Sequence, residues 1–110
     1  MDKFWAWSLT NHTRVAVVDV DAVFDPSGAA STEVFQECSA ELCAVRDNDP
    51  RFMNAGLIVL TPSMARLRHI QSALAVEHHH YDMPEQSLLT RYVEDPNNHM
   101  TFEFLHERWN

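Results

Sequence analysis

The feature that most constrains this chain is an apolar run that ends in two aspartates one residue apart. Residues 15–18 are valines and an alanine, and Asp19 and Asp21 follow them. Such a run predicts a buried strand, and side chains at positions i and i+2 of an extended segment point to the same side. Two carboxylates on one side form a hard oxygen site suited to Mg²⁺ or Mn²⁺ with phosphate oxygens. The alternative is structural, because such aspartates also serve as turn residues and helix caps.

Length and charge exclude several classes of protein. At 110 residues the chain is expected to form one domain, residues 1–110, and a hydrophobic content of 45% suits a folded globule. The net charge of −8 and the presence of only one lysine, Lys3, argue against a nucleic-acid partner or an anionic membrane surface. No apolar run reaches the ~18 residues of a membrane span, and the first residues do not resemble a signal peptide.

The two cysteines bear on the expected compartment. Cys38 is predicted near the end of a helix and Cys43 in the following strand, so we expect two reduced, buried thiols. Nothing in the sequence indicates an oxidising compartment, and a cytoplasmic location is expected. The Golgi lumen is the alternative for a full-length protein. With only two glycines, the chain has no glycine-rich phosphate-binding loop.

Apolar periodicity and turn residues predict alternating strands and helices, and therefore an α/β fold. Helices are expected at residues 3–9, 31–38, 62–76 and from about residue 82, and strands at residues 15–19, 41–45, 54–60 and 101–105. Thr61 is predicted to cap the third helix, with Pro62 at its first position. The inward residues expected on the helices are Val34, Phe35, Met64, Leu67, Ile70, Leu74, Leu88, Leu89, Tyr92 and Val93.

Four stretches in this order carry a family resemblance. They are residues 3–9 leading to the Asp-x-Asp run, Asp47 followed by Asn54-Ala55-Gly56, residues 81–89 with Glu85-Gln86, and residues 104–110. Together they resemble the family-8 retaining glycosyltransferases, which include glycogenin and galactinol synthase. The resemblance implies a partial GT-A fold, with a mixed sheet flanked by helices. It also implies that the family's N-terminal nucleotide-binding half would precede Lys3.

The resemblance assigns roles to the residues of these motifs. Asp19 and Asp21 would hold Mn²⁺, or Mg²⁺, on the diphosphate of a UDP-sugar, and the metal would offset the charge of the departing UDP. Lys3 would place a positive charge near the phosphate or the sugar. The implied reaction transfers a hexosyl group with retention to an acceptor that is a glycan, a polyol or a protein.

The same resemblance places substrate-binding and catalytic residues. Asp47, Asn54 and Gly56 would contact the sugar, and Gln86 would lie near the anomeric carbon with Glu85 beside it. The chain departs from the family at Glu85, where the family has Asp. One extra methylene displaces a carboxylate, and a displacement of about 1 Å can lower a rate ~100-fold. The family's third metal ligand, a histidine, would follow residue 110.

Two other functions remain open at this stage. One is a catalytically inactive, glycosyltransferase-like fragment that binds a partner or a sugar weakly. Apolar surface on its sheet edge and on the aromatic helix at residues 3–9 would lead it to self-associate or to dock on a partner. The other is a phosphohydrolase of the haloacid dehalogenase type, in which Asp19 and Asp21 would be nucleophile and acid/base, and residues 57–61 would form the second motif. That mechanism needs a later lysine, and none follows Lys3. The His78–His80 run is expected to be a solvated loop rather than a zinc site.

Overall fold

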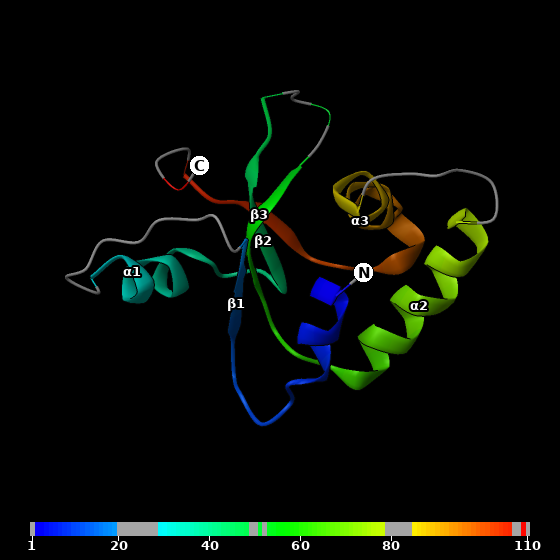
Figure 1. The fold of residues 1–110 in the computed structure, drawn as a ribbon, viewed down its shortest axis with the longest axis horizontal. Helices are drawn as coiled ribbons and strands as arrows, with labels where there is room; N and C mark the ends of the chain where they lie inside the picture. The colour runs from blue at the N-terminus through cyan, green and yellow to red at the C-terminus, as the bar shows by residue number, and fades with distance from the viewer. Residues whose placement is uncertain are drawn as a thin grey trace.

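The computed structural model describes residues 2–19, 29–48, 51, 53–78, 85–106 and 109. Within these residues, four strands form one mixed sheet in the order β1-β3-β2-β4 (Figure 1). The strands β1 (Val15–Val18) and β2 (Leu42–Arg46) run antiparallel to β3 (Met53–Leu60), and β4 (Phe102–Phe104) runs parallel to β2. The predicted α/β fold with a mixed sheet flanked by helices is confirmed.

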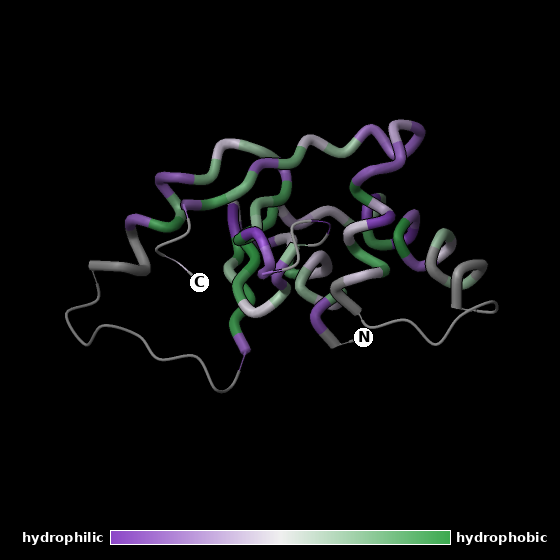
Figure 2. The backbone as a smooth tube through the Cα atoms, turned by 90° about the horizontal axis from the view of Figure 1, so that it is seen from above, coloured by the Kyte–Doolittle hydropathy of each residue, from purple (hydrophilic) through white to green (hydrophobic). Residues whose placement is uncertain are grey.

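Helices cover both faces of this sheet. The 3-10 helix η1 (Asp2–Ser8) and the helices α2 (Met64–His78) and α3 (Glu85–Glu94) lie on one face, and α1 (Ala29–Glu37) lies on the other (Figure 1). A short 3-10 helix, η2 (Pro96–Asn98), leads from α3 towards β4. The most hydrophobic part of the backbone is the set of central strands between these layers (Figure 2).

Each face of the sheet has its own core. The larger core, under η1, α2 and α3, contains Phe4, Ala6, Trp7, Leu42, Ala44, Met53, Ile58, Leu60, Leu67, Ile70, Leu88, Leu89 and Tyr92. The smaller core, under α1, contains Val34, Cys38, Cys43, Val45, Leu57, Val59 and Leu105. Neighbours along a strand alternate between the two cores, as the period of two in an extended chain requires. The apolar runs of β2 and β3 are therefore buried on both sides, as continuous hydrophobic strands are.

The register of β3 brings the end of β1 to the beginning of β3. Val15 lies opposite Leu60, and Val18 lies opposite Leu57. On the other side of β3, Ala44 pairs with Ile58 but Val45 pairs with Asn54, so residues 55–57 have no partners on β2. This irregularity bends β3 where Asp19 emerges from β1, and such bulges often re-aim side chains at functional sites.

The start of α2 corrects the predicted cap. The helix begins at Met64, because Ser63, and not Thr61, supplies the capping oxygen: its Oγ accepts a hydrogen bond from the backbone N–H of Arg66 at 3.1 Å. Thr61 still belongs to the strand pairing, because its N–H donates to the carbonyl of Glu41 at 2.9 Å. The strand pairing therefore extends to Thr61, and the helix begins only after Ser63.

Most of the predicted inward residues are buried. Buried or partly buried are Val34, Leu67, Ile70, Leu88, Leu89, Tyr92 and Val93, and the side chain of Leu74 lies outside the described residues. The prediction is wrong for Phe35 and Met64, whose side chains are exposed. The buried positions in α1 and directly after it are Val34 and Cys38, four residues apart. A stripe at that spacing leaves Phe35 about 100° further round the helix.

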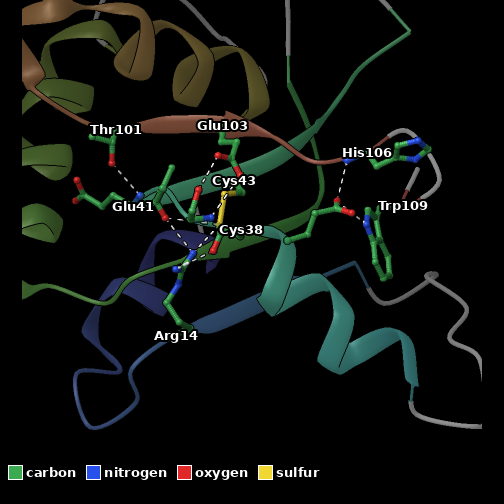
Figure 3. The surroundings of a disulfide bond; sticks show 11 residues. Arg14, Cys38, Glu41, Cys43, Thr101, Glu103, His106 and Trp109 are labelled. Carbon is green, nitrogen blue, oxygen red and sulfur yellow. Dashed lines mark hydrogen bonds between the residues drawn. A yellow bond between two sulfur atoms is a disulfide. The ribbon is translucent and has the colours of Figure 1, made fainter.

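The two cysteines form a disulfide, so the prediction of reduced thiols is wrong (Figure 3). Because α1 ends at Glu37, Cys38 lies in the turn after the helix, 5.9 Å from Cys43 between Cα atoms, which is within the usual span of a disulfide. Arg14 supports this turn by donating hydrogen bonds to the carbonyls of Cys38 at 3.2 Å and Ala40 at 3.0 Å. Both cysteines are buried.

Removing the disulfide is expected to lower the free energy of unfolding by about 2 kcal/mol, the chain-entropy value for such a short loop. The measurement is urea unfolding of a Cys38→Ala, Cys43→Ala variant beside the unmodified chain, with and without dithiothreitol. The reductant should destabilise the unmodified chain by a similar amount and leave the variant unchanged. Equal unfolding curves for the unmodified chain in both buffers would contradict the disulfide.

Among the described residues, no helix is both long and apolar enough to cross a membrane. This agrees with the sequence-based expectation of no membrane span.

Candidate functional site

The side chain of Asp19 lies at the carboxyl end of β1, where it forms an ion pair with Lys3. The two charged atoms, Asp19 Oδ1 and Lys3 Nζ, are 2.6 Å apart. Lys3 Nζ also donates to the carbonyl of Ala55 at 2.5 Å, and the backbone N–H of Asp19 donates to the carbonyl of Gly56 at 2.9 Å. Residues from η1, β1 and β3, far apart in sequence, therefore meet at one point.

Lys3 reaches this point because the part of η1 that follows it is anchored to the core and to α2. Phe4 and Trp7 are buried in the larger core with their rings stacked, 6.1 Å between centroids. The carbonyl of Trp7 accepts a hydrogen bond from the N–H of Ser63 at 2.9 Å, which ties the end of η1 to the start of α2. A lysine near a chain terminus usually stays solvated, but this anchoring directs Lys3 towards β3.

Asn54 and Gly56 shape the floor of the site. The side-chain oxygen of Asn54, Oδ1, accepts a hydrogen bond from the N–H of Gly56 at 2.7 Å. A Cβ atom at position 56 would lie 2.9 Å from that Oδ1 and 3.2 Å from Asp19 Oδ2. Because the first distance is shorter than real Cβ contacts, position 56 requires glycine for Asn54 and Asp19 to keep their present positions.

The Lys3–Asp19 ion pair is accessible to a ligand. The side chain of Asp19 is 45% exposed and that of Lys3 is 22% exposed. An ion pair in contact with water adds little to stability, typically about 0–1 kcal/mol, so its partners are not held together by a large free energy. The arrangement offers a carboxylate for a cation and, one ion-pair distance away, an ammonium group for an anion.

The structure brings together four of the predicted site residues: Lys3, Asp19, Asn54 and Gly56. Asp47 follows the last residue of β2, Arg46, which pairs with Met53, so Asp47 lies at the same end of the sheet. Asp21 lies outside the described residues. In the part of the chain that the structure describes, no group of three or more His, Cys, Asp or Glu side chains is arranged to hold a metal ion.

Glu85 and Gln86 form the first turn of α3, but their side chains lie outside the described residues. Their helix is fixed to the start of β3 by Thr90, whose Oγ1 accepts a hydrogen bond from the N–H of Met53 at 3.1 Å. Position 86 lies one turn before Thr90, about 6 Å along the axis and on the same face of α3. The sequence analysis did not identify Thr90, although a threonine within an otherwise apolar buried stripe was a signal for it.

No family model matches the chain. Two proteins of Arabidopsis thaliana are similar to it: "Putative glucuronosyltransferase PGSIP7", 34% identical over 102 residues, and "Putative glucuronosyltransferase PGSIP8", 32% identical over 95 residues. These alignments include 93% and 86% of the chain, but only 19% and 18% of the two relatives.

A solved structure, the glycosyltransferase GlyE of Streptococcus pneumoniae TIGR4, aligns with 99% of the chain at a TM-score of 0.73. The fold is a glycosyltransferase fold. At 18% sequence identity this likeness concerns the fold alone, and the chain spans 28% of that structure. The resemblance found from the sequence is therefore confirmed at the level of glycosyltransferases, while the assignment to family 8 stays a prediction. The phosphohydrolase alternative receives no support from these comparisons.

The register gives a second reason against the phosphohydrolase. That hypothesis needs the end of β3 at Thr61 close to the aspartates. Because β3 is antiparallel to β1, Leu60 lies opposite Val15, and Thr61 therefore lies beyond the opposite end of β1 from Asp19. Five residues of an extended strand separate Asp19 from the position opposite Thr61, a distance of about 17 Å. Asp19 and Thr61 are too far apart to act on one phosphate group.

Proposed function

We propose that the chain carries the metal and sugar subsites of a glycosyltransferase that uses a UDP-sugar donor and transfers the sugar with retention. The observation that carries this proposal is the meeting of Lys3, Asp19 and Asn54 beside Gly56 at the carboxyl end of β1. Charges of both signs beside a glycine suit a diphosphate and its counter-ion. The similarity to glycosyltransferases in sequence and fold supports this assignment.

The residues present fit a hard divalent cation. Asp19 offers an exposed carboxylate and Asn54 an amide oxygen nearby, and the absence of a Cβ at Gly56 lets both side chains lie close to the backbone there. Oxygen ligands of this kind are preferred by Mg²⁺ and Mn²⁺. We propose that Asp19 and Asp21 hold the metal, which when bound stabilises negative charge on the departing UDP.

The other site residues would bind and orient the donor. Lys3 would exchange its ion pair with Asp19 for a contact with a phosphate oxygen, and Asp47 and Asn54 would accept hydrogen bonds from sugar hydroxyls. Transfer breaks the bond between the anomeric carbon and the phosphate oxygen and forms a bond from that carbon to an acceptor hydroxyl, which loses its proton. We keep Gln86, with Glu85, as the residues proposed to lie near the anomeric carbon.

The names of the two plant relatives bear on the donor sugar. Both are named for glucuronosyl transfer, so we extend the predicted hexosyl donor to include a glucuronosyl one. The acceptor, whether glycan, polyol or protein, is left open. The buried disulfide favours the lumen of the Golgi over the cytoplasm as the proposed location, because stable disulfides are uncommon in reducing compartments.

The test is calorimetric titration of UDP into the chain with and without Mn²⁺. We expect binding that requires Mn²⁺ and that weakens at least about tenfold in an Asp19→Asn, Asp21→Asn variant, since charged contacts typically contribute ~1.5–3 kcal/mol. A Gly56→Ala variant should also bind more weakly, because the added Cβ displaces Asn54 and Asp19.

The matched control is Glu103→Gln, which removes a carboxylate on β4, three strands from Asp19 in the sheet. Ser39 donates two hydrogen bonds to Glu103, from its Oγ at 2.8 Å and from its backbone N–H at 3.3 Å. The oxygen of glutamine can still accept the shorter one, and because this contact is exposed the loss of the longer one should change the fold little. This control should bind UDP and Mn²⁺ as the unmodified chain does. Absence of Mn²⁺-dependent binding in the unmodified chain would refute the proposed site.

The inactive binding fragment stays an alternative because of one observation at η1. Trp5 is 60% exposed and Leu9 is also exposed, although both adjoin the buried anchors of η1. Large apolar side chains on a surface favour contact with another protein or another part of a longer chain. Under this alternative the chain would associate through these residues and would not bind UDP, so the same titration separates the two functions.

A further inference from the structure

A pocket lies between α3 and the neighbouring strands β2 and β4. Its volume is about 160 Å³, the share of about five water molecules in the liquid. Such a volume suits one small polar group or a single sugar ring rather than an extended chain. The polar and aromatic residues that line it are Arg46, Arg51, Thr90, Glu94, Phe102 and Phe104.

An arginine on an aromatic floor is the distinctive feature of this pocket. The guanidinium carbon of Arg46 lies 4.0 Å from the centre of the Phe104 ring. Phe104 is held in turn by an edge-to-face contact with Phe102, 4.8 Å between ring centroids. In a guanidinium stacked on an aromatic ring, the N–H groups stay in the plane of the guanidinium and point away from the ring face. There they can donate to both oxygens of a carboxylate.

The charge of the pocket selects a monoanion. Arg46 and Arg51 bring two positive charges and Glu94 brings one negative charge, which leaves one net positive charge. This positive pocket stands in a chain whose net charge is −8. A carboxylate would neutralise it, whereas a dianionic phosphate would leave an excess of negative charge close to Glu94.

The pocket lies on the same face and at the same end of the sheet as the Lys3–Asp19 ion pair. Both lie on the face covered by η1, α2 and α3, and Met53, which lines the pocket, directly precedes Asn54. The strands β1 and β2 are separated only by β3, so their axes are about 10 Å apart. A sugar held in the pocket would thus be close to the proposed transfer site.

From this arrangement we propose that the pocket binds the carboxylate of a uronic acid ring, with Arg46 as the principal contact and Phe104 beneath the guanidinium. The role in transfer rests on the proposed function, but the binding itself does not. The uronic acid would belong either to the sugar of the donor or to an acidic acceptor glycan. The chemistry is shared by both sources, and the experiment distinguishes them.

The test compares methyl β-glucuronoside with methyl β-glucoside, which differ only in a carboxylate at the sixth carbon. Saturation-transfer NMR on the 110-residue chain, without nucleotide or metal, should show about tenfold tighter binding of the glucuronoside. An Arg46→Gln variant should lose this preference, and Arg51→Gln should reduce it. The control Arg68→Gln removes an exposed positive charge from α2 and should keep the preference.

Two results would overturn the proposal: equal binding or no binding of the two glycosides, or a preference that persists in both Arg46→Gln and Arg51→Gln. Thermal unfolding of each variant shows whether it is folded, and Arg51, exposed in a loop, provides the second test if Arg46→Gln unfolds. These readouts need no UDP, so they are separate from the test of the transfer site.

The donor and acceptor sources are distinguished with nucleotide sugars. If the carboxylate belongs to the donor, UDP-glucuronate should bind about tenfold more tightly than UDP-glucose, and Arg46→Gln should remove the difference. If it belongs to the acceptor, the two nucleotide sugars should bind equally, and methyl glucuronoside should still bind when UDP and Mn²⁺ are saturating. Either outcome supports carboxylate binding in the pocket, and the two outcomes differ in whether the donor or the acceptor carries the carboxylate.

Discussion

Replacing Trp7 by alanine is expected to lower the free energy of unfolding by about 3–5 kcal/mol, the range for truncating a buried large aromatic residue. The side chain of Trp7 is 0% exposed, and it is the bulkiest of the fully buried side chains in the larger core. Its indole Nε1 has no hydrogen-bond partner, so the loss comes from packing rather than from a polar contact. Urea unfolding monitored by circular dichroism measures the change.

The matched control is Trp5→Ala, two residues away on the same helix. Trp5 is 60% exposed, and substitutions at such surface positions usually change stability by less than about 0.5 kcal/mol. A second variant, Trp7→Phe, keeps the aromatic packing and removes the unpartnered N–H, so it should lose less than Trp7→Ala. Similar losses for Trp5→Ala and Trp7→Ala would contradict the role of Trp7 as the anchor of η1.

The loss of Trp7 should also reach the candidate site. Trp7 and Phe4 hold η1 on the core, and η1 presents Lys3 to Asp19. A folded Trp7→Ala chain should therefore bind UDP and Mn²⁺ more weakly than Trp5→Ala. This consequence connects a residue of the core, which touches no ligand, to the charge arrangement at the end of β1.

Much of the site was predictable because its residues lie in or directly beside segments whose apolar pattern identifies them as strands. The β-branched run before Asp19 and the Asn54-Ala55-Gly56 strand were both predicted as strands at nearly their observed bounds. Their pairing was not predictable in detail, because register depends on contacts between distant residues rather than on period. The resemblance supplied the connection of Lys3, Asp19 and Asn54, and the antiparallel register explains how they meet.

The errors have particular physical causes. Cys38 was placed in a helix, although α1 ends one residue earlier and the turn brings Cys38 to Cys43. Thr61 was predicted to cap α2, but its N–H donates to the carbonyl of Glu41 and Ser63 caps the helix instead. In both cases a bond to another segment, a disulfide for Cys38 and a backbone hydrogen bond for Thr61, accompanies a helix boundary that local sequence preference does not predict. Asp21, Glu85 and Gln86 remain predictions, because their side chains lie outside the described residues.

Replacing Arg66 by alanine is expected to lower the free energy of unfolding by about 2–4 kcal/mol, near the cost of breaking a buried, hydrogen-bonded ion pair. Arg66 was not identified from the sequence, yet it connects α2, α3, η2 and the start of β2. Its guanidinium donates to both carboxylate oxygens of Glu41, at 2.7 and 3.0 Å, and to the hydroxyl of Tyr92 at 3.0 Å. It also donates to the carbonyls of Asn98, at 2.6 Å, and His99, at 3.3 Å.

The electrostatics of this network agree with its geometry. The hydrogen bonds from Arg66 to Glu41 raise the pKa of Arg66 above its usual value, although partial burial acts in the opposite direction. The two side chains are 16% and 24% exposed, so water screens the pair less than it screens surface ions. Alanine at position 66 would leave the carboxylate of Glu41 and the hydroxyl of Tyr92 without this donor.

The matched control is Arg68→Ala, which removes the same charge from the exposed side of α2 and should change stability by less than about 0.5 kcal/mol. Arg66→Lys keeps the charge but cannot reproduce the bidentate contact with Glu41, so its stability should lie between those of Arg66→Ala and the unmodified chain. A double-mutant cycle with Glu41→Ala should give a coupling energy of at least about 1 kcal/mol. The prediction is contradicted if Arg66→Ala is no more destabilising than Arg68→Ala. In that case apolar packing alone would hold α2, α3 and η2 together, and the polar network would serve only to orient the segment that leads from α3 into β4.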